Sequence, residues 1–416
     1  MEWSRETPNV QARPRLRAVD FVPWTDNGKP VILARDPLGI TERVLVIPRE
    51  LLFLLSRMDG SRTVLDLQAE ISKLEGRIVF REELERLLLT LDEAGFLEND
   101  AFRARVKAVE EEFRRSSTRS AYHAGRSYPE NPVELQAWLD DFYRHPQGAG
   151  RPNPSDKRRV RALVAPHIDF RLGGPVYSHA YRALGESSGA DLFVIFGTGH
   201  QGLPDFFSIA SKDFETPLGT AQLDRAVYEG LRNRLGGRFQ EDFSHRTEHS
   251  IEFQLIWLLD LFPSRPFKIL PILCSFSHLE VVSPDQAGLA AVRLLAEALQ
   301  QTVGELGRHV VYVAGVDFSH VGPRYGDPGP TAQSLIQQVL AEDLRLFDAL
   351  LTLDGDEFIR LVDRAGDRRR ICGFPALVAL LQILPRDARG RLLAHSYAKM
   401  DEEGSFVTFA SIVFEE

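Results

Sequence analysis

The sequence is poor in cysteine: its 416 residues include two, Cys274 and Cys372. Two cysteines do not make a disulfide framework, so we expect a reducing compartment, the cytoplasm. The chain also lacks a long apolar run, since no stretch approaches the roughly 20 residues needed to span a bilayer. Its first 17 residues contain no apolar segment of the kind found in signal peptides. These absences predict a soluble, cytoplasmic protein that does not bind membranes.

Positive charge is also scarce. The chain has 50 Lys and Arg residues against 59 Asp and Glu residues, which gives a net charge of −9. An acidic chain is not expected to bind nucleic acid in general, because that function needs a basic surface. A length of 416 residues is large for one hydrophobic core, so we expect two domains.

The N-terminal quarter has the pattern of a small α+β domain. Short apolar runs between turn residues predict strands, and leucines at helical spacing predict helices that follow them. Gly95 is expected to end the last helix, and a short strand of sequence GFLE to follow. This order resembles a winged helix, preceded by a frayed segment. We expect the frayed segment at 1–18, strands at 19–22, 30–34 and 44–47, and helices at 48–58, 63–74 and 81–94.

A charged helix over 101–118 is predicted to connect this first domain, 1–115, with a second domain, 119–416. In the second domain, apolar runs rich in β-branched residues alternate with helical patterns. That alternation is typical of an α/β fold with a mostly parallel central sheet flanked by helices. We expect strands at 160–165, 191–197, 267–273, 309–316, 392–398 and 405–414.

Three histidines follow predicted strands of the second domain: His167, His200 and His320, with Asp317 three residues before the last. Ligands of open α/β sheets bind at the carboxyl ends of the strands, so these side chains predict a metal or acid–base site. Each residue alone has a plainer interpretation. His167 would cap a loop, Asp317 and His320 would form a structural pair, and the glycine-rich turn before His200 would cradle a phosphate.

Two further candidates stand at predicted helix starts. Cys372 follows three arginines, 368–370, an environment that favours a thiolate for use as a nucleophile or soft metal ligand. It could equally be a small buried apolar residue. His249 lies one helical turn before Glu252, whose carboxylate would orient the imidazole. Alternatively, Glu248 and Glu252 would only complement the dipole of the helix.

Taken together, these segments resemble the Memo family, also called AmmeMemoRadiSam system protein B. The resemblance implies a fold similar to class III nonhaem iron extradiol dioxygenases. It further implies a metal site at His167, His200 and Cys372, with Asp317, His320 and His249 close by. The matching segments occur in order over residues 119–416, and they are 123–129 (HAGRSYP), 165–167 (APH), 173–177 (GGPVY), 197–200 (GTGH), 216–219 (TPLG), 248–252 (EHSIE), 317–320 (DFSH) and 371–373 (ICG).

The chain departs from the family pattern beside two of these histidines. The family usually has Ala-Gly-Tyr after the first ligand histidine, and here the residues are Ile168, Asp169 and Phe170. Thr198 replaces a proline before the second. A tyrosine hydroxyl is thereby replaced by a bare ring and a carboxylate is added, so the substrate is expected to differ.

The N-terminal domain resembles a PqqD-type winged-helix module on pattern alone, at 59–64 (DGSRTV) and 91–97 (LDEAGFL). Such modules tend to bind a peptide rather than DNA, so a protein partner is expected there. The alternative is a structural cap on the second domain.

Three functional hypotheses follow. In the first, two imidazoles and a thiolate bind iron or copper in a redox enzyme of dioxygenase type, because soft sulfur disfavours hard cations. Asp317, His320 and His249 would then handle protons, and Asp317 would supply a carboxylate ligand if Cys372 does not bind. In the second, the same pocket holds a metal or a peptide without turnover, as a scaffold. In the third, the protein is a component of a radical or peptide-modification pathway.

Overall fold

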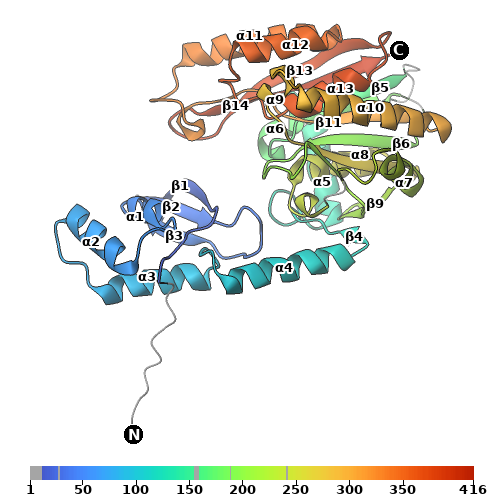
Figure 1. Cartoon of the computed structure of the whole chain (residues 1–416). Coiled ribbons are helices and arrows are strands. Elements are labelled where there is room, and N and C mark those ends of the chain that lie inside the picture. Colours follow the sequence, from blue (N-terminus) through green and yellow to red (C-terminus); the bar gives the residue numbers. More distant parts are fainter. Residues whose placement is uncertain (1–11, 27–28, 154–158, 188, 240–241) are drawn as a thin grey trace. The chain divides into compact units, whose positions relative to one another are not determined.

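The computed structural model describes residues 12–26, 29–153, 159–187, 189–239 and 242–416 (Figure 1). The chain divides into two compact units, Met1–Arg115 and Ser116–Glu416. Within the described residues, no helix is long and apolar enough to cross a membrane.

The N-terminal unit begins with a three-stranded antiparallel sheet in the order β1-β2-β3, and four helices follow it. A capping box at Thr63 starts the second helix, and Gly95 follows the third with a φ of 73°, a left-handed conformation that suits glycine. The elements are β1 (Asp20–Asp26), β2 (Lys29–Arg35), β3 (Leu45–Pro48), α1 (Leu51–Arg57), α2 (Val64–Glu75), α3 (Arg81–Glu93) and α4 (Asp100–Arg115).

Two details of this unit differ from the prediction. Residues 12–18 were expected to fray, but Leu16 donates its N–H to the Met58 carbonyl at 2.7 Å, and Arg17 forms a buried ion pair with Asp36. Residues 1–11 lie outside the described residues. The expected GFLE strand is reduced to an isolated bridge between Leu16 and Leu97. Both differences arise from pairing with distant parts of the chain, which local pattern does not reveal.

The second unit contains a sheet of eleven strands. Nine of them lie in the order β12-β14-β5-β11-β6-β10-β9-β8-β4, and the other two pair at its side, β13 with β14 and β7 with β10. The central strands β5, β11, β6 and β10 are parallel, whereas the hairpins β13–β14 and β8–β9 are antiparallel. The strands are β4 (Thr118–Arg119), β5 (Val160–Ala165), β6 (Leu192–Thr198), β7 (Phe207–Ile209), β8 (Asp213–Thr216), β9 (Gly219–Leu223), β10 (Lys268–Cys274), β11 (Val310–Gly315), β12 (His320–Val321), β13 (Arg389–Lys399) and β14 (Phe406–Glu415).

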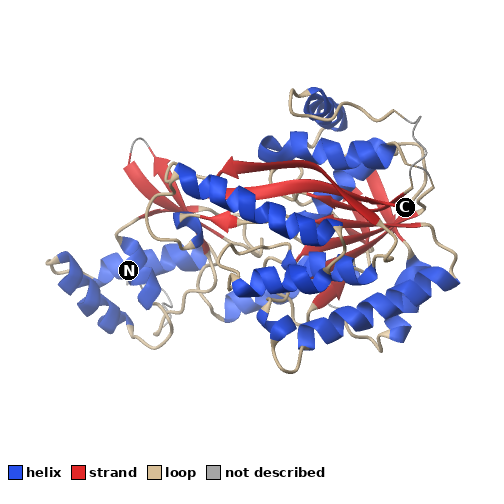
Figure 2. Cartoon of the chain, turned by 90° about the horizontal axis from the view of Figure 1, so that it is seen from above, coloured by secondary structure: helices blue, strands red, loops and turns tan. Residues whose placement is uncertain are grey.

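Two layers of helices cover this sheet (Figure 2). Alternate residues of each central strand point to opposite faces, so Val164 packs into one core and Leu163 into the other. The first core is closed by α7 (Arg225–Arg234), α10 (Ala287–Glu305), α11 (Gln333–Leu351), α12 (Gly355–Arg364) and α13 (Phe374–Ile383), with the short α9 (Leu279–Val282). The second is closed by α5 (Pro132–Arg144), α6 (Phe170–Gly185) and α8 (His249–Leu261).

The architecture confirms the predicted class: an α/β unit with a large, mostly parallel sheet flanked by helices, accompanied by a small N-terminal unit with its own sheet. The long strands lie where periodicity placed them. In the second unit, the strands of two to five residues, such as β7 and β12, were not predicted, because so short a run carries no readable period.

Candidate metal centre

The site is built first from the carboxyl ends of three neighbouring strands. Strands β5, β11 and β6 are parallel neighbours, so the residues that follow them emerge at one edge of the sheet. His167 follows β5, Asp317 follows β11 and His200 follows β6. The residues His167 and Asp317 are 2% and 3% exposed, so their polar groups are held out of water at this edge.

Helix starts from both layers complete the site. His249 is the first residue of α8, and Cys372 lies directly before Gly373, the N-cap of α13. Each of these helix starts can lie close to the sheet edge because a glycine stands at the contact. A Cβ on Gly373 would lie 2.5 Å from the Cβ of Val316, and one on Gly315 would lie 2.5 Å from the Ser250 carbonyl oxygen. The sheet edge is therefore approached from each face by a different helix start.

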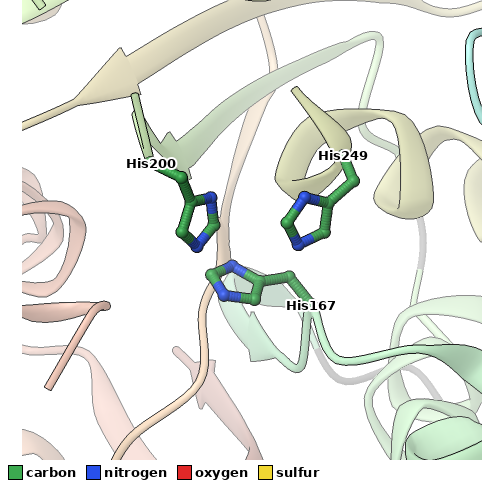
Figure 3. A group of neighbouring side chains, drawn as sticks. All are labelled: His167, His200 and His249. Carbon is green, nitrogen blue, oxygen red and sulfur yellow. The ribbon is translucent and has the colours of Figure 1, made fainter. Parts of the chain in front are cut away.

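Three imidazoles converge there (Figure 3). His167, His200 and His249 each offer a nitrogen, and these atoms all lie within 4.8 Å of one another. The ring centroids are 4.8 to 5.2 Å apart. His167 is buried, whereas 35% of the His200 side chain and 31% of the His249 side chain are exposed. The cluster therefore has a closed floor at His167 and is accessible to solvent at the other two rings.

The contacts of each ring determine which nitrogen faces the cluster. The Nδ1 of His167 lies 2.9 Å from the Gly315 carbonyl oxygen. The Nδ1 atoms of His200 and His249 lie 3.0 and 3.2 Å from Oε1 of Glu248. When Nδ1 of His167 and of His200 donates to these oxygens, the Nε2 lone pair of each of the two rings is left for a ligand. This is the arrangement that orients metal-bound histidines in proteins.

Burial and charge give the three imidazoles different protonation preferences. Burial lowers the pKa of His167 to about 3 and lowers that of His249 well below its ordinary value. For His200, burial acts in the same direction, but the Glu248 carboxylate and the Cys372 thiol outweigh it and raise the pKa. Two of the rings are thus neutral at neutral pH, the form that binds a metal.

Cys372 contacts the same cluster. Its Sγ lies 3.3 Å from Nε2 of His167 and 3.6 Å from the Asp317 carbonyl oxygen. Burial raises the pKa of its thiol, even though His200 favours the thiolate. The preceding arginines do not supply the expected activation, because Arg369 pairs with Asp343 and Arg370 with Asp327. A bound cation would instead be needed to remove the thiol proton.

Asp317 and His320 lie beside the cluster. Oδ1 of Asp317 accepts the backbone N–H groups of His167 and Ile168, and its Oδ2 lies 3.6 Å from Nε2 of His167. Burial raises the pKa of Asp317 to about 6, despite His320 and these N–H donors. Burial also lowers the pKa of His320, although Asp317 favours its charged form. The pair therefore combines a carboxyl that titrates near neutrality with a neutral imidazole.

Glu248 was assigned no more than a dipole role from sequence, and it is the carboxylate that holds the site. It caps α8 through the N–H groups of His249 and Ser250 and contacts both exposed imidazoles. Glu252, expected to orient His249, instead lies in a buried ion pair with Arg119. Helical spacing placed Glu252 one turn from His249, but the N-cap residue reaches back over the first turn, which spacing alone does not show.

Glu252 secures the HAGRSYP segment against α8. Its carboxylate accepts the Tyr128 hydroxyl and the backbone N–H of His123, the latter at 3.0 Å. Arg119, which is 1% exposed, also donates to the Glu248 carbonyl at 2.8 Å. The His123 ring then lies 5.8 Å from the His249 ring. This segment thus supports the cluster from behind α8.

Comparison with solved structures gives a weak likeness. The uncharacterized protein JW3007 from Escherichia coli K12 matches with a TM-score of 0.34 and 14% identity, over 61% of this chain and 99% of that chain. A score this low carries no argument about the fold, so the similarity to extradiol dioxygenases stays a prediction.

Comparison by sequence is decisive about the family. A MEMO1 family protein of Aquifex aeolicus is 31% identical over 97% of this chain and 100% of its own length. The MEMO1 family protein TTHA0924 of Thermus thermophilus is 31% identical over 81% of this chain and 94% of its own length. A third, MK0963 of Methanopyrus kandleri, is 29% identical over 71% of this chain and 98% of its own length. The model of the family described as Memo-like protein matches residues 119–413. The chain belongs to the Memo family, as its motifs predicted.

Proposed function

We propose that this protein binds iron or copper at the candidate metal centre and is a redox enzyme of dioxygenase type. The observation that supports this most directly is the convergence of His167, His200 and His249 within 4.8 Å, with the Cys372 sulfur 3.3 Å from the first of them. Imidazole and thiolate suit iron and copper, whereas magnesium and calcium prefer oxygen donors. His249, predicted from sequence to handle protons, is better suited to be a third imidazole ligand.

The residues present fit such a metal. The lowered pKa values of His167 and His249 mean that neither imidazole must lose a proton before binding. The cluster brings several nitrogens close together at a partly buried place, where one bound cation would satisfy them together. When bound, the metal would supply electron transfer and a coordination position for dioxygen or substrate.

The chain itself would supply orientation and proton transfer. Asp317 has a pKa of about 6, so it can hold or release a proton at neutral pH beside the imidazole of His167. His320, kept neutral by burial, would exchange that proton. Glu248 fixes the orientation of the two exposed imidazoles, and the buried floor at His167 excludes water from one side.

Oxygen consumption tests the redox proposal. The full-length protein would be loaded anaerobically with iron(II) or copper and assayed with catechol-type and thiol substrates. We expect substrate-dependent uptake that falls in Asp317→Asn, because the charge is lost while the shape is kept. The matched control is Asp260→Asn, at the opposite end of α8 from His249, and it should not alter oxygen uptake. Bound metal without uptake for either substrate class would contradict the redox proposal.

A second candidate function is a scaffold that binds a peptide or metal without turnover, within a radical or peptide-modification pathway. One observation favours a protein partner. The N-terminal unit exposes large apolar side chains on β1, on α1, and in and next to β3. Trp24, Val44 and Val46 are more than half exposed, at 58%, 54% and 57%, and Phe53 is 38% exposed. Retained metal together with peptide binding to this unit, and no turnover, would support the scaffold.

A further inference from the structure

One carboxylate, Asp343 on α11, is buried next to the segments that form the centre. It is 0% exposed, and it accepts hydrogen bonds from two side chains at 2.7 Å each: the Ser319 hydroxyl and the Arg369 guanidinium. Arg369 also donates to the Ser319 hydroxyl at 3.3 Å and is itself 9% exposed. These three side chains form a buried cluster that takes no part in the proposed chemistry.

The two hydrogen-bond donors of Asp343 come from the two segments that carry the site on this side, and Nε2 of His395 on β13 lies 3.5 Å from its other carboxylate oxygen. Ser319 lies between Asp317 and His320, and Arg369 lies three residues before Cys372. The segments are also joined directly, since the His320 N–H donates to the Arg369 carbonyl at 2.6 Å. Asp343 thus connects the loop after β11 to the segment that presents the cysteine.

The cysteine-bearing segment needs such support. Between α12 and α13, Asp367 and Arg370 have φ values of 44° and 50°, a left-handed conformation that non-glycine residues rarely adopt. Strain of this kind persists only where surrounding contacts hold it. Arg370 is held by Asp327 at 2.8 Å, and Arg369 by Asp343. Loss of the second contact would release the backbone three residues from the sulfur.

We propose that Asp343 is a positioning residue that sets the place of the Cys372 sulfur relative to the imidazoles. It does so through Arg369, and through Ser319 it fixes the Asp317–His320 loop in the same frame. The inference rests on the proposed function, since it takes Cys372 as a metal ligand. It adds a residue that touches neither metal nor substrate, on a helix remote in sequence from every ligand.

Cobalt(II) titration of the full-length protein tests this. Cobalt gives an absorption band for thiolate coordination that histidine ligands do not produce, so the band reports on Cys372 separately from the rest of the site. We expect Asp343→Asn to bind cobalt about 10- to 100-fold more weakly, as for other residues that orient metal ligands. The thiolate band should also be reduced relative to the remaining cobalt spectrum.

The matched control is Asp260→Asn, which breaks the ion pair of the buried Asp260 with the partly exposed Arg151, at 2.6 Å and away from the cluster. It should keep the band and the affinity. Arg369→Lys covers the case in which Asp343→Asn does not fold. Lysine keeps the positive charge but cannot contact both Asp343 and Ser319 as the guanidinium does, so the thiolate band of this variant should also weaken. An unchanged band and affinity in folded Asp343→Asn or in Arg369→Lys, or equal loss in Asp260→Asn, would overturn the inference. A wild-type protein that binds cobalt without the band would instead refute Cys372 as a ligand, and the inference with it.

Discussion

Buried ionisable groups are arranged differently at two places in this protein, one in each unit. In the N-terminal unit, Arg17 and Asp36 form a pair of opposite charges, with side chains 3% and 0% exposed, and Asp36 also accepts three backbone N–H groups. At the sheet edge of the second unit, groups of the same kind face one another: three imidazoles within 4.8 Å and a thiol beside them.

The difference distinguishes a structural pair from a candidate metal site. A carboxylate that meets a guanidinium and several N–H donors is satisfied by the fold itself. Imidazoles that direct their free nitrogens at one another gain little from the fold, and a cation between them would satisfy all of them at once. The first arrangement predicts effects on stability, and the second predicts effects on metal binding.

Breaking the structural pair should give the largest effect. Asp36→Asn leaves the buried Arg17 guanidinium without its counter-charge, which typically costs about 3–5 kcal/mol. Hydrogen exchange of the full-length protein should show faster exchange in residues 12–97 alone, with metal content unchanged. Faster exchange spread evenly over residues 116–416 would show that the contrast between the units does not hold.

The carboxylate that holds the site should behave oppositely. Glu248→Gln keeps the shape of the side chain but removes the charge that orients His200 and His249. We expect metal affinity to fall about 10- to 100-fold, or roughly 1.4–2.7 kcal/mol, with a smaller change in metal-free stability. Competition with a chelator measures the first and thermal unfolding the second. A loss of stability without a loss of metal affinity would show that Glu248 stabilises the fold and does not orient metal ligands.

Acid should destabilise the metal-free protein through the cluster. The pKa of His167 is about 3 when folded against 6.5 unfolded, so its contribution is present above 6.5 and is lost as the pH falls toward 3. Asp317 acts in the opposite sense, because its raised pKa of about 6 favours the folded state at low pH. Between pH 7 and 4 these shifts are worth a loss of roughly 3 kcal/mol at His167 and a gain of roughly 2 kcal/mol at Asp317, a net loss of about 1 kcal/mol. Denaturant unfolding between pH 7 and 4 should show it, and His167→Gln should remove it; an unchanged pH profile in that variant would exclude His167 as the source.

The smallest expected effect lies in the N-terminal unit. Thr63 and Asp66 form the capping box of α2, and Thr63→Ala should cost about 1 kcal/mol. Thermal unfolding of the full-length protein measures this, and cobalt affinity should not change. A change in metal affinity with this exposed cap would mean that the two units are energetically coupled.

The sequence predicted where several residues of the candidate site lie, because their positions follow from strand periodicity. The apolar runs before His167, His200 and Asp317 identified three strands, and parallel order brings their carboxyl ends to one edge. The same reasoning predicted the class of fold. Cys372 was already a candidate at a predicted helix start, and the resemblance to the Memo family grouped it with His167 and His200. Its place depends on a segment that returns to the site from between two helices.

What the sequence did not reveal depends on contacts between distant residues. Which glutamate contacts His249, Glu248 or Glu252, depends on the conformation of one N-cap. The role proposed for Asp343 depends on contacts with Ser319 and Arg369, which are 24 and 26 residues away in the sequence. The arginines before Cys372 suggested an activated thiol, but their charges are taken up by Asp343 and Asp327. Local pattern shows which groups are present and not which partner each one meets.

The metal content of untagged, full-length protein tests the central claim most directly. Mass spectrometry of the wild type should find about one iron or copper per chain, since the soft donor set favours these metals over magnesium. His167→Ala, checked for folding by circular dichroism, should lose that metal, because it removes the buried floor of the cluster. Wild-type protein with only trace metal after supplementation, or equal metal in folded His167→Ala, would contradict the assignment of this cluster as a metal centre.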